Sequence, residues 1–175
     1  MNVDFAKELY FRELDRRAAL DGAPTMRIAA LASLAAVFSF YASHYDPRGA
    51  FLPRLFVLLA AGALCFGSLA AIWILRTYLG FEWQYLANAS KLLEHFNLLD
   101  AAERDGKTAP RTASQLFESR LIAMLVAAAA HNARNNNARS ALLYYSGIYL
   151  AIAVICTMLA GAPVLAQALL RWPIF

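Results

Sequence analysis

Residues 52–75 read LPRLFVLLAAGALCFGSLAAIWIL, and this stretch decides the class of fold. A helix needs about 20 predominantly apolar residues to cross the hydrocarbon core of a bilayer, and this stretch is long enough. Two further apolar runs, residues 26–43 and 141–161, meet or approach the same length. The sequence therefore predicts an all-α integral membrane protein with three transmembrane helices.

Composition agrees with a chain that exposes much of its surface to lipid. Of the 175 residues, 61% are hydrophobic and 16% are charged, whereas a soluble domain is about 45–50% apolar and 25% charged. Cys65 and Cys156 lie inside predicted spans, so we interpret them as small core residues and expect no disulfide framework. The charged first 25 residues lack a small-residue cleavage site, so we expect the first span to be retained as a signal-anchor.

The basic residues predict how the spans are oriented. Of the 16 Lys and Arg residues, 13 lie in the N-terminal part up to Arg27 or between Arg76 and Arg139. By the positive-inside rule these segments face the cytoplasm, while loop 44–51 and the C-terminus face outward. We therefore expect a multi-pass membrane protein with a cytoplasmic N-terminus.

The spacing of the apolar runs divides the chain into four predicted segments. In order, these are a cytoplasmic amphipathic helix, a two-helix transmembrane hairpin, a cytoplasmic helical insert, and a third transmembrane helix with an outer C-terminus. Their bounds are 1–25, 26–76, 77–140 and 141–175. Gly22 and Pro24 are expected to end the first helix, and Pro163 to end or kink the last one.

The insert is expected to fold as a hairpin of two helices. The first is predicted to run through Leu86 to Leu99, and a polar loop with a Gly and a Pro, residues 101–111, follows it. Thr112 and Gln115 have the spacing of a capping box, which predicts the start of the second helix. Its apolar run 121–130 is too short to span a bilayer, so we expect it to pack against the preceding helix; a re-entrant span is the alternative.

The sequence contains no recognisable catalytic or metal-binding motif. His44, His95 and His131 are far apart, and none begins a metal-ligand spacing. The spans carry no ionisable side chain away from their ends, which argues against an ion-coupled transporter. We expect neither an enzyme nor a bound metal or cofactor.

Small residues recur at every fourth position of the second and third predicted spans. Such faces let helices approach closely, because packing rather than the hydrophobic effect drives helix association in lipid. We interpret them either as contacts within one chain or as contacts between copies in a homo-oligomer whose spans line a pore. The residues concerned are Ala63, Gly67, Ala71, Gly147, Ala151 and Thr157.

The most unusual polar stretch lies directly before the third span. On a helix, Asn132, Asn136 and Arg139 share one face. One interpretation is a polar collar at the membrane interface with Arg bound to lipid phosphates; the other is the cytoplasmic mouth of a pore or a pocket for an anionic ligand. The candidate ligand-binding residues are His131, Asn132, Arg134, Asn135, Asn136 and Arg139, with Arg104, Lys107 and Arg111 of the insert loop.

The stretch HNARNNNARSALLYYSGIYL, residues 131–150, and the layout of nearly the whole chain resemble a family of small bacterial membrane effectors. These are the SLATT-type and related proteins encoded beside nucleotide-synthesising or nucleotide-sensing anti-phage systems; the simplest members have two spans and lack the third. The resemblance implies a channel or pore-forming effector of the bacterial inner membrane in anti-phage defence, gated through its cytoplasmic face by a nucleotide or oligonucleotide. It assigns no residue a catalytic role.

A second class of function stays open. A non-conducting membrane anchor or adaptor would use the cytoplasmic helices to recruit a cytoplasmic signalling partner. Both classes imply contact with membrane lipid. The channel additionally requires a homo-oligomer, because three helices alone enclose no aqueous path.

Overall fold

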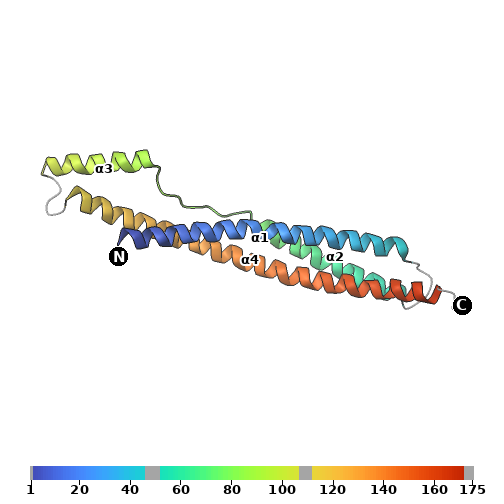
Figure 1. The fold of residues 1–175 in the computed structure, drawn as a ribbon. Helices are drawn as coiled ribbons and strands as arrows, with labels where there is room; N and C mark the ends of the chain where they lie inside the picture. The colour runs from blue at the N-terminus through green and yellow to red at the C-terminus, as the bar shows by residue number, and fades with distance from the viewer. Residues whose placement is uncertain (1, 46–51, 107–111, 172–175) are drawn as a thin grey trace. The chain divides into compact units, whose positions relative to one another are not determined.

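The computed structural model describes residues 2–45, 52–106 and 112–171, and every regular element in these ranges is an α-helix. Four helices follow one another: α1 (Val3–His44), α2 (Leu52–Arg76), α3 (Ala89–Arg104) and α4 (Ala113–Arg171) (Figure 1). α1, α2 and α4 are long and apolar enough to cross a membrane. The predicted all-α class with three candidate membrane helices is therefore confirmed. Most of the predicted outer loop 44–51 lies outside the described residues.

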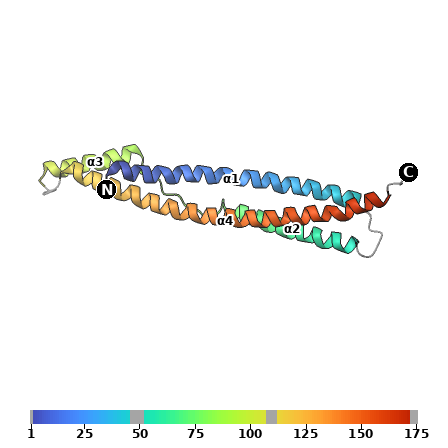
Figure 2. The ribbon, with the colours of Figure 1, turned by 60° about the horizontal axis from the view of Figure 1, so that its bottom comes forward.

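Contacts between the helices group the chain into two compact units. The first unit contains Met1–Leu20 and Phe81–Ala138, and the second contains Asp21–Gly80 and Arg139–Phe175. α1 and α4 each contribute to both units, whereas α2 belongs to the second and α3 to the first. Within the second unit, α2 lies beside α4 (Figure 2).

The apolar length of α2 matches the thickness of a bilayer. Its only charged residues, Arg54 and Arg76, lie at its two ends, about 33 Å apart at 1.5 Å per residue. The hydrocarbon core of a bilayer is about 30 Å thick. Pro53 lies in the first turn of α2, where its missing N–H costs little.

The expected helix end at Gly22–Pro24 is wrong, and of the two outcomes expected at Pro163, an end or a kink of the helix, the end is wrong. α1 continues through Pro24 to His44, and α4 continues through Pro163 to Arg171. A Pro inside a helix removes one hydrogen bond and costs about 3 kcal/mol. Both proline side chains are fully buried, so tertiary packing around them offsets this local cost.

The chain turns at residues 77–80 after α2 and forms no helix over residues 81–88, so the predicted helix through Leu86 is wrong at its start. Gly80 has a φ of 81°, a left-handed conformation that glycine adopts without steric cost. α3 begins only at Ala89, where the side chain of Asn88 caps it by accepting a hydrogen bond from the backbone N of Lys91 at 3.2 Å. Residues 81–88 therefore form an extended segment.

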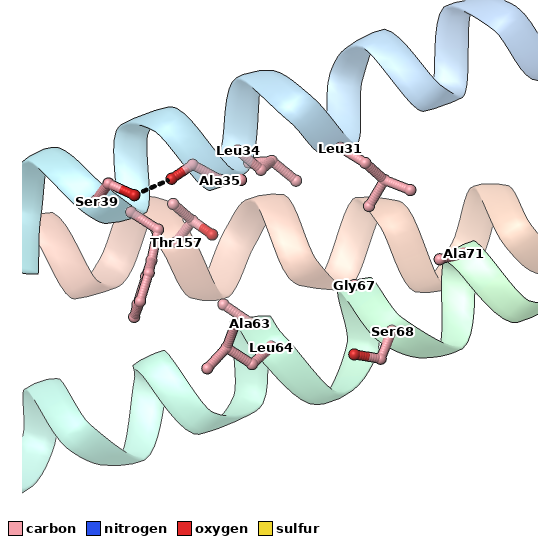
Figure 3. Close-up of a pocket in the computed structure, with 11 residues that line it drawn as sticks. Leu31, Leu34, Ala35, Ser39, Ala63, Leu64, Gly67, Ser68, Ala71 and Thr157 are labelled. Carbon is pink, nitrogen blue, oxygen red and sulfur yellow. Dashed lines mark hydrogen bonds between the residues drawn. The ribbon is translucent and has the colours of Figure 1, made fainter.

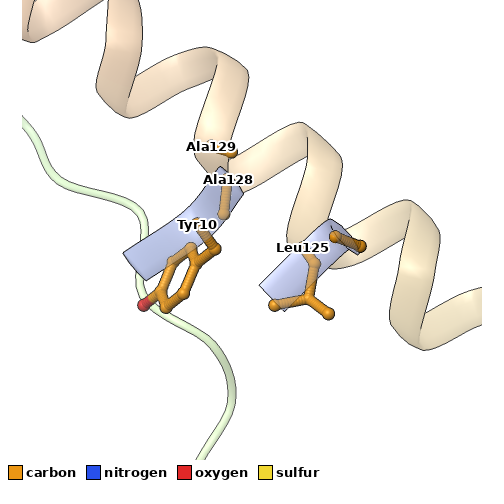
Figure 4. Packing of buried hydrophobic residues seen from close by; sticks show 5 residues of the cluster. Tyr10, Leu125, Ala128 and Ala129 are labelled. Carbon is orange, nitrogen blue, oxygen red and sulfur yellow. The ribbon is translucent and has the colours of Figure 1, made fainter. Parts of the chain in front are cut away.

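A small apolar core joins the N-terminal part of α1 to α4 in the first unit (Figure 4). The sequence predicts α3 as the partner of the run 121–130, but the buried residues of this run pack on α1. α3 contacts the first turns of α4, where the rings of Phe96 and Phe117 meet edge to face at 5.4 Å. The small side chains on α4 let α1 approach closely. The buried core residues are Ala6, Tyr10, Leu125, Ala128 and Ala129.

The capping box at the start of α4 is confirmed. Thr112 Oγ1 accepts a hydrogen bond from the backbone N of Gln115, and Gln115 Oε1 accepts one from the backbone N of Thr112, each at 3.3 Å. The carboxylate of Glu103 at the end of α3 accepts a further bond from the backbone N of Ala113. α3 extends to Arg104, into the predicted loop, and residues 107–111 lie outside the described ranges.

In the second unit, Gly161 of α4 packs against the side chain of Tyr41 of α1. A Cβ atom at this position would lie 2.6 Å from Oη and 2.7 Å from Cζ of Tyr41, which is nearer than such atoms approach one another. Thr157 and Ala160 of α4 are also buried beside this contact. Gly161 therefore leaves the space that the end of the Tyr41 ring occupies.

Replacing Gly161 by Ala is expected to lower the free energy of unfolding by about 1–3 kcal/mol, the usual cost of overpacking. The double variant Gly161→Ala/Tyr41→Leu should recover most of this loss, because leucine removes the end of the ring. Gly22→Ala is the matched control, since a Cβ there meets no atom within 4 Å. Thermal unfolding in detergent measures the effect, and a Gly161→Ala protein as stable as the control would contradict it.

Candidate functional site

The candidate site consists of the extended segment 81–88 and the side chains that hold it in the first unit. Side chains of α4 and α1 form hydrogen bonds with the backbone of every second residue of this segment, namely Glu82, Gln84 and Leu86. Alternation is expected because every second residue of an extended chain faces the same way. We call four side chains of α4 the polar clasp: His131, Asn132, Asn135 and Asn136.

Asn132 is the central residue of the polar clasp. Its side chain is fully buried. Its Nδ2 donates to the backbone O of Gln84 at 3.0 Å, and its Oδ1 accepts from the backbone N of Gln84 at 3.1 Å. One side-chain amide therefore satisfies both backbone groups of one residue, as a neighbouring β-strand would.

The two flanking positions of the segment are held in the same way. His131 Nε2 and Asn135 Nδ2 both donate to the backbone O of Glu82, at 2.8 and 2.6 Å. Because a carbonyl oxygen only accepts, Nε2 of His131 carries the proton. The backbone N of Leu86 donates to Oη of Tyr10 at 3.3 Å, and Figure 4 shows the segment passing beside this side chain.

Asn136 connects α4 to α1 inside the first unit. Its Nδ2 donates to the backbone O of Glu13 at 2.8 Å and to Oε2 of Glu13 at 3.0 Å. Both side chains are buried, and the same carboxylate lies 3.7 Å from Nη1 of Arg16. Two acceptors on Glu13 fix the amide orientation, because the flipped amide would set oxygen against oxygen.

Arg17 of α1 contacts the aromatic side chains of the segment. Its guanidinium lies 4.5 Å from the ring centre of Trp83 and 5.7 Å from that of Tyr85, which is within the range of cation–π attraction. Its Nη1 also donates to Oη of Tyr85. The segment is thus held through its side chains as well as its backbone.

Arg139 makes a separate polar junction in the second unit. Its side chain is 3% exposed; Nε donates to the backbone O of Thr77 at 3.0 Å, and Nη2 donates to Oδ1 of Asp21 at 2.6 Å. Thr77 follows the last residue of α2, where the helix dipole favours a cation. Arg139 therefore joins α1, the end of α2 and α4.

The structure uses most of the predicted ligand-binding residues to bind the chain itself. Arg134 is exposed, and Arg104 forms an ion pair with Asp100 on α3 at 2.5 Å. Lys107 and Arg111 lie outside the described residues. The start of α4, which α3 contacts, is about 27 Å from His131 along the helix, so Arg104 and the polar clasp are not brought into one site.

The predicted helix-packing residues divide between buried and exposed positions. Ala63 and Thr157 are buried within the second unit. A Cβ at Gly67 would lie 3.8 Å from Leu31, and one at Gly147 would lie 3.7 Å from Nη2 of Arg27, so both glycines also face partners within the chain. The exposed members of the set are Ala71 and Ala151.

Sequence reasoning missed several residues of these polar contacts. Glu13 follows Ala6 and Tyr10 at helical spacing and so lies on the buried face of α1; a carboxylate on such a face needs a polar partner, which was the available signal. Asp21 and Thr77 had no comparable signal, because their partner is remote in the sequence. Arg27, close inside the first apolar run, could have been singled out as a charge within a predicted span.

The fold contains three helices long and apolar enough to cross a membrane, and the first unit holds the extended segment through the polar clasp. Comparison of the chain with protein-family profiles, with curated protein sequences and with solved structures gives no match in any of the three. Among the described residues, no group of three or more His, Cys, Asp or Glu side chains is placed to hold a metal ion.

Proposed function

We propose that the protein is a homo-oligomeric membrane channel or pore-forming effector whose first unit controls its three membrane helices. The observation that carries this proposal is the outward face of α1. Small side chains recur there at helical spacing and are all exposed, and no residue in the most apolar window of α1 is buried. Small-residue faces associate by close packing in lipid, so this face suits a helix of a second copy. Its residues are Ala29, Ala32, Ser33 and Ala36.

The proposed topology follows the distribution of basic residues. The first unit and the N-terminus lie in the bacterial cytoplasm, and α1, α2 and α4 cross the inner membrane. Since three helices enclose no aqueous path, conduction requires several copies. The membrane-facing surface of one copy would be covered partly by lipid and partly by its neighbours.

Continuity of α1 and α4 supports control of the spans by the first unit. Both helices run unbroken through the residues at which the two units divide. A trigger that opened the polar clasp would release segment 81–88 and the contact between Asn136 and Glu13. The resemblance to anti-phage effectors suggests a nucleotide or oligonucleotide as the trigger, and Arg12 and Arg134 of the first unit are exposed to meet it.

The double variant Ala32→Leu/Ala36→Leu is expected to reduce both oligomeric mass in detergent and ion flux in liposomes at least tenfold, because its larger side chains keep α1 helices apart. Ala61→Leu, the same change at an exposed position of α2, is the matched control and should leave both unchanged. Flux is measured with and without a panel of linear and cyclic oligonucleotides. A wild-type protein that is monomeric and passes no ions in any condition overturns the proposal.

A membrane adaptor is the second candidate function, and the surface of α3 favours it. Leu93 and Leu98 are 61% and 64% exposed, and the donors of the polar clasp are already bound to the chain's own backbone. An adaptor would use α3 to recruit a cytoplasmic signalling protein. Liposome flux separates the two functions, because an adaptor conducts nothing in any nucleotide condition, while a pore conducts with its trigger and without any partner protein.

A further inference from the structure

Arg27 of α1 is held against α4 by hydrogen bonds from one of its nitrogens. Nη1 donates to Oγ of Ser146 at 2.6 Å and to the backbone O of Leu143. The next residue of α4 is Gly147, where a Cβ would lie 3.7 Å from Nη2 of Arg27. The missing side chain leaves room for the guanidinium beside the helix.

The positive charge of Arg27 lacks a carboxylate partner among the described residues. Its Nε and Nη2, which form the two-donor edge of the guanidinium, make no hydrogen bond within the same ranges. Leu143 and Ser146 lie about 6–10 Å beyond Arg139 along α4, inside the apolar part of the helix. A cation at that depth is costly without an anionic partner.

An apolar groove begins one helical turn from Arg27. It lies between α1 and α2, with Thr157 of α4 at its floor, and Figure 3 shows its lining residues. Its volume is about 430 Å³, within the range of roughly 300–1,000 Å³ typical of small-molecule sites. Leu31 lines the groove and lies four residues after Arg27, on the same face of α1. The groove and the uncompensated charge are therefore neighbours.

We propose that Arg27 and this groove bind one anionic phospholipid. The headgroup phosphate accepts hydrogen bonds from Nε and Nη2 of Arg27, since a guanidinium presents paired donors that match phosphate. One acyl chain lies along the groove. Of the three hydroxyl side chains in the lining, those of Ser39 and Thr157 donate to backbone carbonyls of their own helices. Apart from the third, Ser68, the lining is apolar, which suits a hydrocarbon chain.

The lipid supplies the negative charge that the described residues do not. This site does not depend on whether the protein conducts ions, so a negative result in the flux experiment leaves it standing. The ligand chemistry is a phosphate attached to hydrocarbon. A free phosphate would neutralise the charge of Arg27 but leave the groove empty. A second copy of the chain would fill the groove but leave the charge without an anion.

Native mass spectrometry of the detergent-solubilised full chain tests the site. The protein is titrated with phosphatidylglycerol, with phosphatidylcholine of the same acyl chains, and with inorganic phosphate. We expect one phosphatidylglycerol per chain, bound at least tenfold more tightly than phosphatidylcholine, and no binding of inorganic phosphate at the same concentration. Equal retention of the two lipids, or inorganic phosphate bound as tightly as the lipid, overturns the proposal.

Two variants separate the charge from the groove. Arg27→Gln keeps a donor for Ser146 but removes the charge, and it should abolish the tenfold preference for phosphatidylglycerol; Arg27→Lys should keep it. Ala71→Leu narrows the groove and should weaken both lipids severalfold, whereas Ala61→Leu, outside the groove, should change neither. Unaltered preference in a folded Arg27→Gln protein, or a groove occupied by a second copy in cysteine cross-linking, contradicts the assignment.

Discussion

Arg139→Ala is expected to lower the free energy of unfolding by about 3 kcal/mol, the largest effect of any single substitution that we predict in the second unit. The change leaves the backbone O of Thr77 and the carboxylate of Asp21 without their donor. Breaking a buried ion pair costs about 3–5 kcal/mol. Because Asp21 is half exposed and regains water, we expect the lower end of that range. Chemical unfolding in detergent measures it.

Matched variants show whether geometry or charge is responsible. Arg139→Lys retains the charge, but a single ammonium group cannot reach both acceptors as the guanidinium does. We therefore expect an intermediate loss of unfolding free energy. Asp21→Asn keeps Oδ1 as an acceptor and should cost less than Arg139→Ala. Arg134→Ala, at an exposed position of the same helix, should stay within about 0.5 kcal/mol of wild type. An Arg139→Ala protein as stable as Arg134→Ala would show that the junction contributes nothing.

Asn132→Ala is expected to release the extended segment and to cost about 2–3 kcal/mol. Both backbone groups of Gln84 lose their partner at once, and each unsatisfied group costs about 1–3 kcal/mol when it stays buried. Asn132→Asp keeps an acceptor for the backbone N of Gln84 but sets a carboxylate oxygen against its carbonyl. This variant should therefore be at least as destabilising at neutral pH.

Two local measurements report directly on the segment. Hydrogen exchange at the amide of Gln84 and chymotrypsin cleavage after Trp83 or Tyr85 should both become faster in Asn132→Ala. Asn137→Ala is the control, because Asn137 is exposed on the same helix. If exchange and cleavage are unchanged while Asn132→Ala remains folded, the polar clasp does not hold the segment in solution.

Features of the fold that depend on nearby residues could be predicted from the sequence. The three apolar runs gave the candidate membrane helices, and the spacing of Thr112 and Gln115 gave the start of α4. The path of residues 81–88 could not be predicted in this way. The α4 side chains that bind its backbone lie 48 to 53 residues away in sequence, so no local pattern encodes it. The predicted helix end at Pro24 is wrong for the same reason, because packing against residues remote in sequence outweighs the local cost of a proline in a helix.

The candidate site was predictable in its placement but not in its role. Asn132, Asn136 and Arg139 were assigned to one helical face, and all three are buried. Their chemistry alone does not distinguish a ligand from the chain itself, because a donor that suits a phosphate oxygen also suits a carbonyl oxygen. Arg27 was not among the predicted ligand-binding residues, but its Nε and Nη2 make no hydrogen bond to the described residues and can bind a ligand.

Because side chains hold segment 81–88, substitutions outside the segment can change the path of its backbone. A β-strand tolerates most substitutions in its neighbour, since the neighbour offers only main-chain groups. Here each bond to the backbone of the segment depends on the identity of one side chain, His131, Asn132 or Asn135 of α4 or Tyr10 of α1. A substitution at one of these positions can therefore change the path of the chain between α2 and α3, even when the sequence of residues 81–88 stays the same. Side chains three and four residues apart on α4 thus bind backbone groups that lie two residues apart on the extended segment.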